Sequence, residues 1–199
     1  MSEVLAFLGV AILVIVTPGP DTAMTIRGTL LGGRRAGLLT ACGVVSGQAC
    51  WTVAASAGVT ALLVASEPAF LALKLAGAAY LIYLGAHALL AAIRGTVPEV
   101  KATGTVHART AYRQGLISDL GNPKMAAFFT SLLPQFGTTF ATMLAFGLVF
   151  CLLTWLWLAL YATAIAKLRL GRVYRAIQGV TGAVLVALGV RLAAEGGTR

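Results

Sequence analysis

The chain consists of long apolar stretches separated by short polar segments. The longest charge-free stretch, from Met125 to Ala166, exceeds the length of one membrane helix, which is about 20–25 residues. Pro134 and the polar residues after it supply a turn that divides this stretch in two. The pattern therefore predicts an all-α integral membrane protein with six transmembrane helices. We expect these helices near residues 4–31, 38–64, 71–93, 114–133, 140–165 and 176–193.

A polar stretch at 94–113 separates the predicted helices into two groups of three, at 1–93 and 114–199. Because three is an odd number, two similar halves joined in this way lie upside down relative to each other in the membrane. Short similarities recur between the halves: 79–85 with 183–189, and Pro18 with Pro123. We therefore expect two inverted three-helix repeats joined by a cytoplasmic linker.

The composition agrees with a location in the membrane. Apolar residues make up 59 % of the chain, which has only 15 Lys or Arg and 6 Asp or Glu residues. About a quarter of the residues of a soluble domain are charged, so this chain lacks the polar residues that a water-facing surface needs. The composition thus excludes a soluble enzyme. The first apolar segment follows an acidic Glu3 and is interpreted as a membrane span rather than a removable signal peptide.

The net charge of +9 is explained by membrane topology. The Lys and Arg residues of the loops all follow the first, third and fifth predicted helices. Since cytoplasmic loops carry an excess of these residues, we expect these three loops in the cytoplasm and both termini outside the bacterial inner membrane. A nucleic-acid-binding protein would present a contiguous basic face. No such face is found in the sequence, so we expect no nucleic-acid partner.

The most informative polar residues interrupt the first and fourth predicted helices near their middles. Residues 17–21 read Thr-Pro-Gly-Pro-Asp, and residues 119–124 read Asp-Leu-Gly-Asn-Pro-Lys. Each proline removes a backbone N–H and breaks the helix, and such breaks survive in a membrane only where protein or a wet cavity covers the freed carbonyls. Two breaks at equivalent positions predict a substrate site between the halves. The residues of this site are Thr17, Pro18, Gly19, Pro20, Asp21, Asp119, Asn122, Pro123 and Lys124.

Three charged residues of these breaks, Asp21, Asp119 and Lys124, lie near the predicted membrane centre, where a charge costs roughly 2.5–3.5 kcal/mol. A purely local role is one alternative: Asp21 caps a half-helix, Asn122 forms an N-cap, and Lys124 neutralises Asp119. We favour a transport role in addition, because a helix break in the membrane costs free energy and would serve no function if nothing bound there. Desolvation favours the neutral acid, so Asp21 and Asp119 are expected to respond to protons and to offer a counter-charge to a substrate ammonium.

Several motifs resemble those of the LysE/RhtB-type amino-acid exporters, and they run in the order found in that family. They are Thr-Pro-Gly-Pro at 17–20, Gly-Gly-Arg-Arg-Ala-Gly at 32–37, Gly43 to Gly47, Lys-Leu-Ala-Gly-Ala-Ala-Tyr-Leu at 74–81, Asn-Pro-Lys at 122–124 and Leu-Pro-Gln-Phe at 133–136. The resemblance implies a six-span exporter of amino acids, driven by proton entry. It implies small or neutral substrates, such as homoserine, threonine or leucine, and no cofactor. A homodimer is left open.

The chain departs from this family at three positions. Gln48 stands where the family often has an acid, whereas Asp21 and Asp119 stand where it often has Asn. The acidic groups of this chain are thus expected at the breaks rather than in the second helix. We include Gln48 in the predicted pathway. Tyr80 is a further candidate, with packing and cavity lining as its two possible roles.

Other functions fit the sequence less well. An intramembrane metalloprotease needs a His-Glu-x-x-His motif, and the histidines of the chain are His87 and His107. A thiol carrier would need paired cysteines at the breaks, where none occurs. Export of another small metabolite remains an alternative. Export of a hard metal ion is another, but no resident metal site is expected, and the available oxygen ligands are Asp21, Asp119, Asn122 and Gln48.

Overall fold

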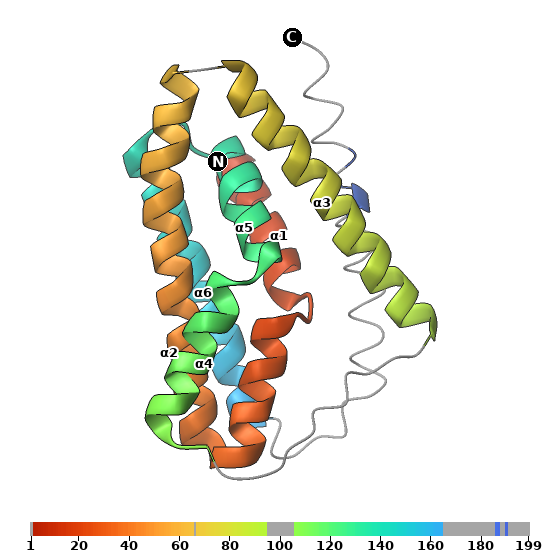
Figure 1. Cartoon of the computed structure of the whole chain (residues 1–199), viewed down its shortest axis with the longest axis vertical. Coiled ribbons are helices and arrows are strands. Elements are labelled where there is room, and N and C mark those ends of the chain that lie inside the picture. Colours follow the sequence, from red (N-terminus) through yellow and green to blue (C-terminus); the bar gives the residue numbers. More distant parts are fainter. Residues whose placement is uncertain (1, 66, 95–105, 165–185, 188–189, 191–199) are drawn as a thin grey trace.

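The computed structural model describes residues 2–65, 67–94, 106–164, 186–187 and 190, and all regular structure in them is helical. The predicted all-α class is therefore confirmed for this part of the chain. The α-helices are α1 Ser2–Val16, α2 Pro20–Ala65, α3 Glu67–Arg94, α4 Ala108–Leu120, α5 Pro123–Ala127 and α6 Phe140–Ala164. A π-helix, Phe128–Leu132, and a 3₁₀-helix, Leu133–Gln135, follow α5. Figure 1 shows these helices side by side, with α3 diverging from the rest.

Both predicted helix breaks are present. The expected helix at 4–31 is interrupted between Val16 and Pro20, where α1 ends and α2 begins. The expected helix at 114–133 is interrupted between Leu120 and Pro123, where α4 ends and α5 begins. Pro20 and Pro123 stand at the starts of the second segments, where their missing N–H groups and fixed φ angles are compatible with a helix.

The turn between the first two predicted helices is tighter than expected. Instead of a loop from 32 to 37, the chain reverses at Gly33 alone, and helical structure resumes at once on both sides (Figure 1). Gly33 has a φ of 70°, a backbone conformation that glycine adopts without steric cost. The expected loop is thus corrected to a single-residue kink within α2.

The fourth helix begins earlier than predicted. Residues 108–113 were expected to belong to the polar linker, but α4 starts at Ala108. Tertiary contacts account for the extra turn, because Ala111 is fully buried and the Tyr112 hydroxyl donates a hydrogen bond of 3.0 Å to Ser46 Oγ of α2. Packing therefore extends the helix into a segment whose local composition resembles a linker.

Glycines bring α2 and α4 into close contact. A Cβ at Gly43 would overlap the Tyr112 carbonyl, and a Cβ at Gly115 would overlap the Thr40 carbonyl. Small residues allow helix backbones to approach in this way. The close approach places Gly47 of α2 directly against Asp119 near the end of α4.

We expect Gly43→Ala to destabilise the protein by about 1–3 kcal/mol, the usual cost of overpacking a close contact. The added methyl would overlap the Tyr112 carbonyl and lie 2.8 Å from the Leu116 nitrogen. Gly58→Ala is the matched control, because no atom lies within 4 Å of a Cβ at that position of the same helix. Melting temperatures in detergent test this, and equal melting of both variants would contradict the close packing.

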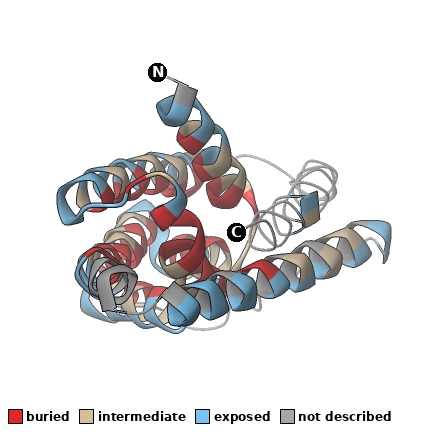
Figure 2. Cartoon of the chain, turned by 90° about the horizontal axis from the view of Figure 1, so that it is seen from above, coloured by how far each residue is buried: buried red, intermediate tan, exposed pale blue. Residues whose placement is uncertain are grey.

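An aromatic cluster fills the core beside α6. The rings of Phe128 and Phe150 stack with their centroids 4.1 Å apart, and Phe129 meets Phe150 edge-on at 5.5 Å. The π-helix turns both Phe128 and Phe129 inward, although they are neighbours in sequence, and both are fully buried. Buried residues accordingly face the interior between the helices in Figure 2.

Among the described residues, two helical segments are long and apolar enough to cross a membrane. They are Pro20–Gly58, which the reversal at Gly33 divides, with a mean hydropathy of 1.4, and Phe140–Ala164, with a mean hydropathy of 2.3. The α6 side chains Leu148, Leu152, Leu156 and Leu160 are exposed in the isolated chain, as lipid-facing residues would be. The sixth predicted helix, 176–193, lies almost entirely outside the described residues, so the count of six helices and the inverted repeat stay predictions.

Candidate functional site

The two helix breaks meet through a pair of hydrogen bonds to Asp21. Asn122 Nδ2 donates to Asp21 Oδ2 at 2.6 Å, and Ser118 Oγ donates to Asp21 Oδ1 at 2.9 Å. Asp21 and Asn122 are both buried. The carboxyl group at the start of α2 is thus bound from both the last turn of α4 and the break that follows it. Two segments far apart in the sequence form one polar centre, as the sequence predicted.

Asn122 has two roles in this centre. Its Oδ1 accepts a hydrogen bond of 3.0 Å from the Lys124 backbone N–H, which makes it the N-cap of α5. The predicted capping role is therefore confirmed. The other end of the same amide bridges to Asp21, so one side chain orders its own helix start and joins the two breaks. Asp21, by contrast, points its carboxyl across to the second break.

The Lys124 ammonium covers the end of α1. Nζ donates to the carbonyl oxygens of Val14 at 3.2 Å and Thr17 at 3.1 Å. In a continuous helix the Val14 carbonyl would bond to the N–H of residue 18, but Pro18 has none. Lys124 supplies the missing donor, and its positive charge also suits the negative end of a helix.

Gly19 leaves room for this contact, since a Cβ there would lie 3.2 Å from Lys124 Nζ. Lys124 is buried and interacts electrostatically with both Asp21 and Asp119. Its role is therefore wider than the predicted neutralisation of Asp119, because its direct hydrogen bonds go to the carbonyls of the first break.

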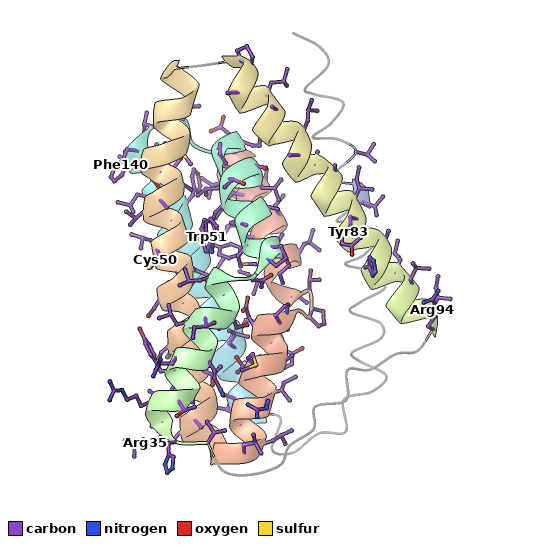
Figure 3. The ribbon with its side chains drawn as sticks, viewed as in Figure 1. Arg35, Cys50, Trp51, Tyr83, Arg94 and Phe140 are labelled. Atoms are coloured by element: carbon purple, nitrogen blue, oxygen red, sulfur yellow. The ribbon has the colours of Figure 1, made fainter. Side chains whose placement is uncertain are left out.

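Asp119 is fully buried near the end of α4. Neither oxygen of its carboxyl has a hydrogen-bond partner in the part of the chain that the structure describes. Gly47 faces it so closely that a Cβ there would lie 2.6 Å from Oδ2. The backbone carbonyl of Asp119 accepts hydrogen bonds from the Trp51 indole N–H at 3.4 Å and from the Asn122 N–H at 3.0 Å. Trp51 is labelled on α2 in Figure 3. The backbone of Asp119 is thus held in place, while its carboxyl has no hydrogen bond within the described part of the chain.

Gln48 lies beside Asp119. It is 1 % exposed, and its Nε2 donates to Met125 Sδ at 3.6 Å. Its Oε1 has no partner among the described residues. The Gln48 amide approaches the Asp119 carboxyl closely enough to interact with it, although without the geometry of a hydrogen bond.

The structure brings most predicted site residues together and leaves one undescribed. Thr17, Asp21, Gln48, Asp119, Asn122 and Lys124 gather around the breaks that Pro18, Gly19, Pro20 and Pro123 create. The Tyr80 side chain lies outside the described part of the chain. The sequence interpretation missed Ser118, the Val14 carbonyl and the indole N–H of Trp51. Ser118 carried a usable signal, since it is polar and directly precedes Asp119 in an apolar stretch.

Comparison with known proteins gives a consistent result. The family of LysE type translocators matches residues 12–196. The uncharacterized membrane protein YrhP of Bacillus subtilis is 28 % identical over 206 aligned residues, which cover 96 % of this chain and 98 % of that protein. The uncharacterized membrane protein YahN of Escherichia coli K12 is 29 % identical over 202 residues, covering 96 % and 89 %.

A leucine efflux protein of Salmonella typhimurium is 34 % identical over 130 residues. The alignment covers 63 % of this chain and 59 % of that protein. No solved structure matches the chain.

Proposed function

Because the chain belongs to the family of LysE type translocators, we propose that it exports a neutral amino acid across the bacterial inner membrane in exchange for protons. It is a bacterial membrane protein of a transporter family, which excludes an enzyme. The similarity to a leucine efflux protein supports a small aliphatic amino acid, of the leucine, threonine or homoserine type, as the substrate.

The observation that carries this proposal is the junction of two discontinuous helices. Asn122 of the second break binds Asp21 of the first at 2.6 Å, and Lys124 binds the carbonyl that Pro18 leaves free. Transporters commonly place their substrate and coupling ions at such discontinuities near the membrane midplane. The described residues of the two breaks supply groups of both charge signs, which a zwitterionic amino acid requires.

The charges of the junction support coupling to protons. Lys124 offers one positive charge to two buried carboxyl groups, Asp21 and Asp119. When both carboxyls are ionised, one negative charge is left without a counter-charge in a site shielded from water. A bound proton or a substrate ammonium restores the balance. Protons entering from outside would thus release the substrate, and their loss inside would restore the site.

The distribution of basic residues supports the proposed orientation. Arg34 and Arg35 adjoin the kink at Gly33, and Arg109 lies in the first turn of α4. Gly32 lies against the Val106 carbonyl, so these residues share one end of the molecule, where Figure 1 places the kink and the start of α4. We assign this end to the cytoplasm by the excess of basic residues, and both termini to the outside.

Export of a hard metal ion is less well supported. Among the described residues, no group of three His, Cys, Asp or Glu side chains is placed to hold a metal. One oxygen of Asp21 is also occupied by the Asn122 amide. No observation on the described residues favours a metal over an organic substrate.

An efflux panel tests the proposal. Cells that overproduce the chain are loaded with leucine, threonine, homoserine or lysine, and the rate of appearance of each in the medium is measured. We expect a neutral amino acid to leave faster than from cells without the protein. If no amino acid left faster and another metabolite or a metal ion did, the proposal would be wrong.

The carboxyl groups give a second test, on the coupling ion. In everted membrane vesicles, an acidic lumen should accelerate amino-acid uptake by the wild-type protein. We expect Asp119→Asn, alone or combined with Asp21→Asn, to insert normally and to lose this dependence, because Asn cannot exchange a proton. Glu3→Gln is the matched control, since Glu3 is an exposed carboxyl on α1. An unchanged dependence in the double variant would exclude these residues as the proton carriers.

A further inference from the structure

Three buried oxygen atoms in the polar centre have no hydrogen-bond donor among the residues that the structure describes. They are Asp119 Oδ1, Asp119 Oδ2 and Gln48 Oε1. The two residues approach each other across the close contact between α2 and α4 and are 0 % and 1 % exposed, respectively. Most buried polar atoms in proteins are paired, and unpaired acceptors in a membrane protein are costly. Their convergence therefore indicates a place that a donor fills during function.

The other polar groups of the centre are already occupied. Asp21 accepts hydrogen bonds from Ser118 and Asn122, one on each oxygen. Lys124 donates to two backbone carbonyls of the first break. The Gln48 Nε2 donates to the sulfur of Met125, a weak acceptor. In the described part of the chain, the acceptors of this centre that have no donor thus belong to one carboxyl group and one amide.

We propose that Asp119 and Gln48 form a binding site for an unsubstituted primary ammonium group, which occupies it in alternation with a proton. An ammonium has three N–H donors and no acceptor, which matches three unpaired oxygens. A protonated Asp119 carboxyl satisfies fewer of them, since its single O–H can donate to Gln48 Oε1 only. This inference rests on the proposed export of amino acids and names the residues that bind the amino group.

Alternation follows from the balance of charge. One proton leaves Asp119 when one ammonium group binds, so this exchange leaves the net charge around Asp119 and Gln48 unchanged. The charged or titratable groups that face Asp119 are Asp21 from α2, Lys124 from α5 and the Cys151 thiol from α6. Two of them, Asp21 and Lys124, are engaged by the hydrogen bonds described above. They keep these bonds whether Asp119 holds a proton or binds an ammonium group. The exchange is thus assigned to Asp119, and Asp21 becomes a positioning residue that holds the two breaks together.

The site predicts a sharp preference among amines. Each N-methyl group removes one donor, and a trimethylammonium group has none. A site built around buried hydrogen bonds discriminates strongly against a ligand that leaves its acceptors unpaired. We therefore expect a trimethylammonium analogue to bind at least about 100-fold more weakly than the primary amine of the same carbon skeleton.

Ligand binding to the purified full-length protein in detergent tests this inference. The probes are leucine, 3-methylbutylamine and its N-trimethyl derivative, and binding is measured by calorimetry from neutral to mildly acid pH. We expect the two primary amines to bind, with weaker binding as the pH falls, and the trimethyl compound not to bind. Asp119→Asn and Gln48→Leu should each weaken primary-amine binding by about tenfold or more, the loss expected for a charge-assisted hydrogen bond.

Controls separate this inference from a general loss of structure. Asp119→Asn is isosteric and should keep the wild-type melting temperature, and Glu3→Gln should bind as the wild type does. Equal binding of the trimethyl compound, unchanged binding by Asp119→Asn, or no binding of either primary amine to the wild type would overturn the inference. In each of these cases, amino-acid efflux by the wild type in the cell panel would still support the proposed export. Absence of efflux with Asp119-dependent binding of 3-methylbutylamine would instead refute only the proposed export.

Discussion

Replacing Lys124 with methionine is expected to abolish export and to destabilise the folded protein by about 3–5 kcal/mol, the cost of removing one partner from a set of buried charges. The Nζ atom of Lys124 donates to the Thr17 carbonyl and to the Val14 carbonyl, whose helical partner is missing because Pro18 has no N–H. The same ammonium lies near both buried carboxyls. Its removal leaves two carbonyls without this donor and two acids without this counter-charge.

Melting temperature and amino-acid efflux measure the two parts of this expectation. Arg109→Met is the matched control, since it removes an exposed cation from the first turn of α4, away from the breaks. We expect that control to melt like the wild type. A Lys124→Met variant that melts and exports as the wild type does would show that Lys124 does not hold the break together.

The proline variants are expected to reduce export by at least about tenfold while inserting into the membrane normally. Alanine at position 18 returns an N–H to the Val14 carbonyl, which then competes with Lys124 for that oxygen. Alanine at position 123 removes the fixed φ that begins α5 after the Asn122 cap. Each substitution favours a continuous helix over the half-helix ends that form the polar centre.

Pro68→Ala is the matched control for these variants, because Pro68 lies exposed at the start of α3. Membrane content by immunoblot and efflux of the preferred amino acid are measured together. If both Pro18→Ala and Pro123→Ala exported at the wild-type rate with normal membrane content, the discontinuous helices would have no part in transport.

The two breaks and their meeting were predictable from the sequence, for local reasons. Proline prevents a helical hydrogen bond wherever it stands. The breaks at Pro18 and Pro123 can therefore be predicted without knowing the fold. A charge in an apolar stretch is also conspicuous, and burial of Asp21, Asp119 and Lys124 demands partners. Because few polar residues were available at that depth, the two breaks were expected to lie close together.

The identity of each partner was not predictable, because it depends on how the helices are rotated against each other. The purely local alternative had Lys124 neutralise Asp119, whereas its hydrogen bonds go to the carbonyls of Val14 in α1 and Thr17 in the first break. The same alternative had Asp21 cap its own helix, but its carboxyl binds Ser118 and Asn122. Helix propensity and charge spacing contain no information on these long-range rotations.

Tertiary packing likewise overrode two local boundaries. The start of α4 at Ala108 follows from the burial of Ala111 and the bond between Tyr112 and Ser46. The sharp reversal at Gly33 requires a positive φ, which the pair Gly32 and Gly33 permitted without indicating that one residue would suffice. Sequence patterns therefore located the elements better than their ends.

Counterflow in proteoliposomes tests most directly the central claim that the joined helix breaks form an amino-acid transport site. The purified protein is reconstituted into liposomes loaded with unlabelled leucine, and the entry of labelled leucine is followed after dilution. We predict rapid transient accumulation with the wild-type protein, and accumulation near that of protein-free liposomes with the double variant Pro18→Ala, Pro123→Ala. Equal accumulation by the double variant, or none by the wild type with leucine, threonine or homoserine, would contradict the account.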